Sequence, residues 1–191
     1  MISGLPPGDS STAAAERRPP PPLLTFDDGP AADTDPLLDI LAACHVEATF
    51  FLVGERAVAR PELVARILRE GHVVGNHSWD HPDLRTLPLG EVREQLERTN
   101  DAIERAGGVR PELFRAPYGF SSPAIDEIAA ELGMRRVHWD VEVGDWLKPG
   151  VEAIANAIVT AAPGAIVLLH DGGGDRSETV AGVARALAAF A

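Results

Sequence analysis

Two adjacent carboxylates follow the first apolar stretch of this sequence. Leu23-Leu24 leads through Thr25-Phe26 into Asp27-Asp28, and Gly29-Pro30 comes next. Two ionised carboxylates side by side repel each other, so both stay charged only beside a cation, with a shared proton, or in full contact with solvent. The Gly-Pro pair alone would justify a solvated turn at this point. The interpretation therefore depends on whether the rest of the chain supplies the means to hold a cation.

His77 and His81 are the first residues that could do so, because they are four positions apart. On a helical turn this spacing puts two imidazoles on one face, a common way to present two nitrogens to zinc or a similar ion. A solvated histidine pair is the plainer alternative. With one carboxylate of the Asp27-Asp28 pair, the histidines would form the open three-ligand arrangement of a catalytic metal, with water in the remaining positions. The second aspartate would then be free to take a proton from that water. Such ligands suit zinc, with cobalt or nickel as alternatives.

Hydrolysis also needs an oriented base and an acid. Arg115 could keep an aspartate ionised and oriented through a bidentate pair. His170 follows the most apolar run of the chain and titrates in the useful range; an acidic neighbour such as Asp145 would fix its tautomer. The alternative for His170 is a strand-end histidine bonded to a backbone carbonyl. Trp146, next to Asp145, is predicted to line a pocket.

The remaining residues of these types lack such neighbours, and we assign them to structure. The prediction is that the other histidines are structural or at the surface, that the single cysteine is a small core residue, and that the two other tryptophans belong to the core. These residues are His45, His72, His138, Cys44, Trp79 and Trp139.

The elements that must position these side chains show two apolar patterns, which alternate along the sequence: short apolar runs and apolar residues at helical spacing. Short apolar runs predict strands at about 23–26, 48–53, 73–74, 113–114, 136–141 and 165–169. Helical spacing predicts helices at 36–44, 61–71, 90–106, 123–132, after Gly150 and at 178–190. This alternation predicts an α/β fold with a parallel sheet of six or seven strands, more consistent with a closed or nearly closed barrel than with an open doubly wound sheet. Every polar cluster named above then lies at the carboxyl end of a strand, the rim where such barrels build their sites.

Composition excludes several other classes of function. A net charge of -12 argues against nucleic acid, because little basic surface would neutralise phosphates. No apolar run of membrane-spanning length occurs, no glycine-rich nucleotide motif follows a strand, and nothing indicates a protein partner. Residues 1–22 are rich in proline and small residues and are predicted to be a flexible leader ahead of one domain at 23–191. They contain no recognisable signal peptide, so the sequence leaves localisation open between the compartment of synthesis and export from a longer precursor.

Taken together, five motifs resemble the polysaccharide deacetylase family, carbohydrate esterase family four, also called the NodB homology domain. They occur in the family's order and span Leu23 to about Phe190. The motifs are Thr-Phe-Asp-Asp-Gly at 25–29, His-Ser-x-x-His at 77–81, Arg-x-Pro-Tyr at 115–118, Asp-Trp at 145–146 and Leu-x-His at 168–170.

The resemblance implies a distorted (β/α) barrel of about seven parallel strands and metal-dependent hydrolysis of an acetyl group. It implies that Asp27 is the general base, tethered by Arg115, and that His170 is the general acid, oriented by Asp145. The ligand set implied for the metal is Asp28, His77 and His81. It further implies that the Tyr118 N–H and the metal stabilise the oxyanion, and that Leu168 and Trp146 shape the acetyl pocket. Family members usually add a strand after the last helix, whereas this sequence stops at Ala191. We therefore expect a barrel that is either open at that edge or truncated.

The expected substrate is a glycan containing N-acetylglucosamine: chitooligosaccharide, chitin or peptidoglycan. The same residues would serve an O-acetyl esterase acting on xylan, or an amide hydrolase acting on a non-sugar metabolite. A non-catalytic carbohydrate-binding domain is a further alternative. Intact Asp27, Arg115 and His170 argue against it, since a binder needs neither a base nor an acid.

Overall fold

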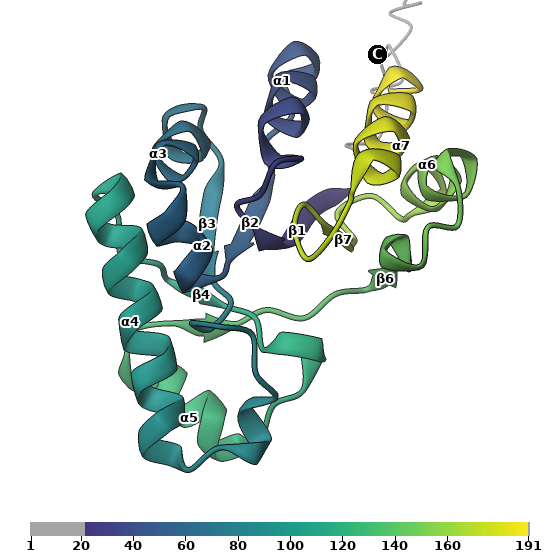
Figure 1. Ribbon diagram of the computed structural model, residues 1–191. Coiled ribbons are helices and arrows are strands. Elements are labelled where there is room, and N and C mark those ends of the chain that lie inside the picture. Colours follow the sequence, from purple (N-terminus) through teal and green to yellow (C-terminus); the bar gives the residue numbers. More distant parts are fainter. Residues whose placement is uncertain (1–21, 191) are drawn as a thin grey trace, which may run out of the picture.

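A single curled sheet of seven parallel strands organises the protein. The computed structural model describes residues 22–190 (Figure 1). The strands lie in the order β5-β4-β3-β2-β1-β7-β6, and every pairing between neighbours is parallel. Their bounds are Leu23–Gly29 (β1), Thr49–Leu52 (β2), Val73–Asn76 (β3), Leu113–Phe114 (β4), Arg135–Arg136 (β5), Val141–Glu142 (β6) and Ile166–His170 (β7). The predicted α/β fold with about seven parallel strands is confirmed.

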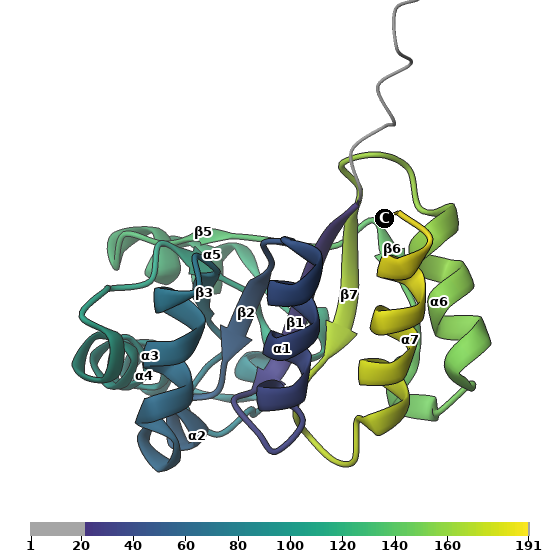
Figure 2. The same cartoon turned by 90° about the horizontal axis from the view of Figure 1, so that it is seen from above.

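Helices cover the convex side of this sheet (Figures 1 and 2). The α-helices are Thr34–Cys44 (α1), Gly54–Ala59 (α2), Pro61–Arg69 (α3), Leu89–Gly107 (α4), Pro123–Glu131 (α5), Val151–Thr160 (α6) and Ser177–Ala188 (α7). Short 3-10 helices lie at Leu84–Thr86 (η1), Pro117–Gly119 (η2) and Asp145–Leu147 (η3). Helix α2 was not predicted from the sequence, and none of the helices at 22–190 is long and apolar enough to cross a membrane.

The alternating direction of side chains along each strand separates the hydrophobic core from the candidate site. In β1, Leu24 and Phe26 are buried in the main hydrophobic cluster beneath the helices. Thr25 and Asp27 alternate with them and point to the concave side of the sheet, because successive side chains of a strand face opposite ways. Val167 and Leu169 of β7 join the same cluster. Apolar packing on the convex side thus leaves the concave side free for polar residues.

The strand predicted at 136–141 is wrong as a single element. It is two short strands, β5 and β6, at opposite edges of the sheet. The residues between them cross the open side: Val137 N donates to Phe114 O and Asp140 N donates to Ile166 O, both at 2.8 Å. Figure 1 shows this crossing as the long segment leading to β6. Since β5 and β6 do not pair, the sheet is an open half-barrel, consistent with the expected open edge.

The other predicted element boundaries lie closer to the observed ones. Strand β1 extends to Gly29, past the predicted end at Phe26, so Asp27 and Asp28 belong to the strand itself. The predicted leader at 1–22 lies, apart from Pro22, outside the described residues.

Candidate active site and metal centre

The carboxyl end of β1 turns two consecutive carboxylates to the same side. In a regular strand Asp27 and Asp28 would face opposite ways. Here the pairing with β2 shifts register between Asp27 and Gly29, and Asp28 has φ 72°, in the left-handed region. Such a bulge re-aims a side chain, and both carboxylates come within 4 Å of the Nε2 atom of His77.

His77 and His81 lie in a loop after β3, so the predicted helical turn is wrong. Ser78 and His81 have φ values of 65° and 63°, in the left-handed region, which a regular right-handed helical turn does not contain. The loop nevertheless brings the two imidazoles together, with ring centroids 5.0 Å apart. His77 Nδ1 lies 2.8 Å from the backbone oxygen of Arg115 and donates to it, which leaves Nε2 unprotonated and facing Asp28.

Side chains outside the loop hold it in this shape. Gln95 of α4 accepts hydrogen bonds from Trp79 N at 2.7 Å and Asp80 N at 3.3 Å, and its amide donates to Asp80. Asn76 accepts from Ser78 N at 2.8 Å. The positions of the two histidines therefore depend on α4 and on the end of β3.

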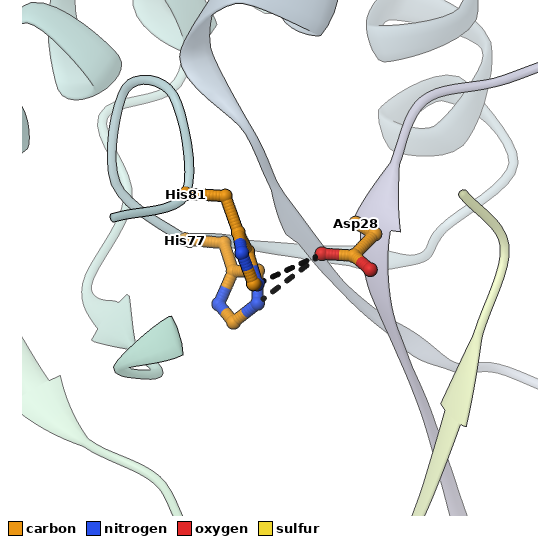
Figure 3. A group of neighbouring side chains, drawn as sticks. All are labelled: Asp28, His77 and His81. Atoms are coloured by element: carbon orange, nitrogen blue, oxygen red, sulfur yellow. Dashed lines mark ion pairs between the residues drawn. The ribbon is translucent and has the colours of Figure 1, made fainter. Parts of the chain in front are cut away.

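Asp28, His77 and His81 form a cluster suited to a divalent cation (Figure 3). Asp28 Oδ1 lies 3.6 Å from His77 Nε2 and 3.1 Å from His81 Nε2. This oxygen is buried and has no hydrogen-bond partner, an arrangement that needs an explanation. A carboxylate oxygen and two imidazole nitrogens converging on one point are all electron-pair donors, so a cation satisfies all three.

The charges of these groups agree with that function. Burial by itself would raise the pKa of Asp28, but His77, His81, His170 and Arg56 outweigh it, and the pKa lies below its ordinary value. Burial, together with neighbouring His77, lowers the pKa of His81. The carboxylate is therefore ionised and the imidazole neutral near pH 7, the forms in which both bind metals.

Asp27 is held by a buried guanidinium. Arg115 Nη1 donates to Asp27 Oδ1 and to Thr25 Oγ1, both at 2.8 Å. The predicted bidentate pair is wrong, because the second nitrogen, Nη2, donates to the backbone oxygen of His138 at 3.1 Å. Arg115 is only 1% exposed and its guanidinium lies over the ring of Phe51. This contact orients one oxygen of Asp27 and leaves Oδ2 facing His77 at 3.7 Å.

His170, at the end of β7, pairs with the buried Asp145 of η3. His170 Nδ1 lies 2.8 Å from Asp145 Oδ1. The other carboxylate oxygen accepts from the His170 backbone N–H at 2.9 Å and from Thr179 Oγ1 at 2.8 Å. Burial lowers the pKa of His170, but the hydrogen bond and charge of Asp145 outweigh it and raise the pKa above its ordinary value. With Nδ1 engaged, Nε2 is the nitrogen left for a ligand.

Comparison with known proteins identifies the family. The family model described as polysaccharide deacetylase matches residues 15–137. This chain belongs to the polysaccharide deacetylase family. It is 44% identical over 154 residues to a chitooligosaccharide deacetylase of Sinorhizobium fredii, covering 78% of this chain and 71% of that protein. It is 42% identical over 173 residues to a peptidoglycan-N-acetylglucosamine deacetylase of Bacillus cereus, covering 86% and 78%.

A solved structure of the same family agrees with the fold. A family 4 carbohydrate esterase from Streptomyces lividans, in complex with acetate, superposes with a TM-score of 0.84 at 34% identity. The match covers 91% of this chain and 89% of that one. The family resemblance of the motifs is therefore confirmed, and the chain is a polysaccharide deacetylase of the hydrolase class.

The candidate site is a pocket of about 380 Å³ on the concave side of the sheet. It is lined by Asp27, Asp28, His77, His81, Tyr118, Gly119, Trp139, Glu142, Trp146, Leu168, His170 and Arg176. Predicted site residues Tyr118, Trp146 and Leu168 all lie in this pocket, and Arg115 and Asp145 lie directly behind it. A larger cavity, of about 680 Å³, is lined by the amino ends of the strands and contains none of the predicted site residues.

Four pocket residues are not among those predicted from the sequence: Gly119, Trp139, Glu142 and Arg176. Trp139 was predicted to be core, yet it lines the pocket from the crossing segment. Glu142 and Arg176 were not singled out; their only signal was proximity in sequence to Asp145 and to His170. The other predictions for structural residues hold: His45 and His138 are exposed, while Cys44 and Trp79 pack partly buried against the core. His72 is buried, and its Nδ1 accepts from Ala48 N.

Proposed function

We propose that this polysaccharide deacetylase is a metal-dependent N-deacetylase acting on glycans that contain N-acetylglucosamine. One observation carries the proposal: an aspartate oriented by a buried arginine and a histidine oriented by a buried aspartate face one pocket beside the three-ligand cluster. The relatives named above act, by their names, on chitooligosaccharide and on peptidoglycan N-acetylglucosamine. Chitooligosaccharide is the substrate class we favour.

Asp28, His77 and His81 would hold the ion, and zinc is the metal that these donors suit best, ahead of cobalt or nickel. When bound, such an ion polarises the acetyl carbonyl and makes water more acidic. The chain itself supplies the proton transfers. Asp27 would accept a proton from the attacking water through its free Oδ2 oxygen, and Arg115 orients this base through the hydrogen bond to Oδ1.

The opposite wall of the pocket would supply the acid. His170 would donate a proton to the leaving nitrogen of the sugar. Asp145 engages Nδ1 of this imidazole, so Nε2 is the nitrogen that would carry the donated proton. The backbone N–H of Tyr118 would stabilise the charge that develops on the acetyl oxygen. Tyr118 has φ 59°, which sets the direction of its backbone in the short helix η2. Leu168 and Trp146 would enclose the acetyl methyl group.

A turnover assay with two substrates and a chelator tests the proposal. Protein reconstituted with zinc should release acetate from N-acetylated chitopentaose, lose this activity on chelation and recover it on adding metal back. Acetate release from acetylated xylan alone would favour the O-acetyl esterase. Activity that survives exhaustive chelation would remove the metal from the mechanism. Binding of chitopentaose without turnover would favour a carbohydrate-binding domain.

A further inference from the structure

Glu142 is an exposed carboxylate that lines the pocket and has no part in the proposed reaction. It ends β6, the strand next to β7 at the sheet edge (Figure 1), and pairs in register with Leu168. Paired residues of neighbouring parallel strands project to the same side of a sheet. Leu168 is a pocket residue, so Glu142 faces the pocket too, and it is among the lining residues. Val141, one position earlier, instead packs against the core on the convex side.

Within residues 22–190, the Glu142 carboxylate has no hydrogen bond or ion pair with the protein. The other charged side chains of the pocket are all engaged. Asp27 is bound by Arg115, and Asp28 belongs to the histidine cluster. Arg176 is 7% exposed and donates to the backbone oxygens of Gly172 and Gly173, so it cannot swing across to Glu142 without breaking those bonds.

A ligand that fills the pocket therefore lies beside one negative charge, that of Glu142, which no side chain of the described residues neutralises. Covering an ionised carboxylate removes its water, which is unfavourable unless the ligand supplies a cation or donors in return. A ligand with its own carboxylate nearby would add repulsion, the usual means by which an interface rejects a partner. Sugars of the proposed substrate class differ in this respect: glucosamine carries an ammonium group, N-acetylglucosamine is neutral, and acidic sugars carry a carboxylate.

We infer that Glu142 is a specificity-determining residue that favours glycans with an ammonium-bearing sugar beside the reacting N-acetylglucosamine and disfavours glycans with a carboxylate there. The inference rests on the proposed deacetylase function and narrows its substrate class to neutral and partly deacetylated glucosamine glycans. The net charge of -12 acts in the same direction at long range, so a test must separate the local carboxylate from the total charge.

The test compares Glu142→Gln with Glu112→Gln in the zinc-loaded protein. Both variants remove one exposed carboxylate, but Glu112 lines the cavity at the amino ends of the strands. The substrates are three chitopentaoses: fully N-acetylated, with one internal sugar as glucosamine, and with one internal sugar oxidised to a C6 carboxylate. We expect wild type to prefer the ammonium over the carboxylate pentamer in kcat/KM, and Glu142→Gln to reduce this ratio about fivefold, the range of a partly exposed ion pair. Glu112→Gln should keep the wild-type ratio.

A binding measurement separates this inference from the proposed function. Calorimetry with the fully deacetylated pentamer, which cannot be hydrolysed further, should show about fivefold weaker binding by Glu142→Gln than by wild type or Glu112→Gln. If Glu142→Gln binds this pentamer more weakly but the wild-type protein releases no acetate from the N-acetylated pentamer, the specificity role of Glu142 is supported and the deacetylase function is rejected. An unchanged kcat/KM ratio, unchanged binding in Glu142→Gln, or an equal effect in Glu112→Gln would overturn the inference.

Discussion

The carboxylates of Asp27 and Asp28, consecutive residues of one strand, both face His77 Nε2, at 3.7 and 3.6 Å. The left-handed backbone of Asp28 makes this possible, because it breaks the alternation that would send the two side chains to opposite faces. Arg115 then distinguishes them: it binds Asp27 and leaves Asp28 to the histidines. Two identical side chains thereby acquire different proposed functions, one as a base and one as a ligand.

Removing one ligand should abolish tight metal binding. We expect His81→Ala to weaken zinc affinity by at least about 100-fold, because only two of the three protein donors remain. Calorimetric titration of the metal-free protein measures this directly. His45→Asn is the control, since His45 is exposed and has φ 55°, a conformation that Asn tolerates. Equal zinc affinity of His81→Ala and wild type would refute the cluster as a metal site.

The proposed base can be separated from the metal site. Asp27→Asn should lower kcat by about 100-fold or more, because the amide cannot accept the proton of the attacking water. Zinc affinity should stay within a few fold of wild type, since Asp28 and both histidines remain. The variant also leaves Arg115 without its counter-charge, so its thermal unfolding must be measured alongside. A folded, zinc-bound variant with wild-type kcat would eliminate Asp27 as the base.

The Asp145–His170 pair predicts a shift in pH dependence. The acid is active when protonated, and Asp145 raises the pKa of His170, so the alkaline decline of kcat/KM should lie above the ordinary pKa of histidine. Asp145→Asn removes the negative charge, lowers this pKa and should move the decline to lower pH. Profiles of kcat/KM against pH for both proteins measure the shift. A decline that stays in place, or moves to higher pH, contradicts His170 as the acid.

Gln95 should influence metal binding without touching the metal site. It bonds to Trp79 and Asp80 in the loop between the two histidines. Gln95→Ala should therefore weaken zinc affinity by about 10-fold to 100-fold, as loss of an outer supporting residue typically does. Glu94→Ala, an exposed position on the same helix, is the matched control. If both variants bind zinc like wild type, the loop holds its shape without the Gln95 hydrogen bonds.

Asp171 should make the metal-free protein less stable as the pH rises. Burial raises its pKa from 3.8 to about 7, against the hydrogen bond donated by Thr34. Between these two pKa values the folded state holds a proton that the unfolded state has released. The stabilisation of the folded state by this proton is complete below pH 3.8 and is lost as the pH rises through about 7. In denaturant titrations between pH 3.8 and about 7, the free energy of unfolding of Asp171→Asn should fall less steeply with pH than that of wild type. Parallel curves would show that Asp171 is ionised throughout.

Local patterning was sufficient for the fold class and for the identity of the motif residues. Apolar runs such as 165–169 and helical spacing such as 90–106 depend on neighbours in sequence, which is why they predicted the strands and helices near their observed places. Because parallel strands align their carboxyl ends, the motif residues could also be expected on one rim.

Contacts between distant segments decided the rest. The bulge at Asp28, the non-helical loop at His77–His81 and the division of 136–141 into β5 and β6 all depend on partners far away in the chain, such as Gln95, Phe114 and Ile166. The placement of Glu142 in the pocket follows from the pairing of β6 with β7. A sequence period reports which side of an element is apolar. Only the packed structure determines which elements meet, and hence which side chains share a pocket.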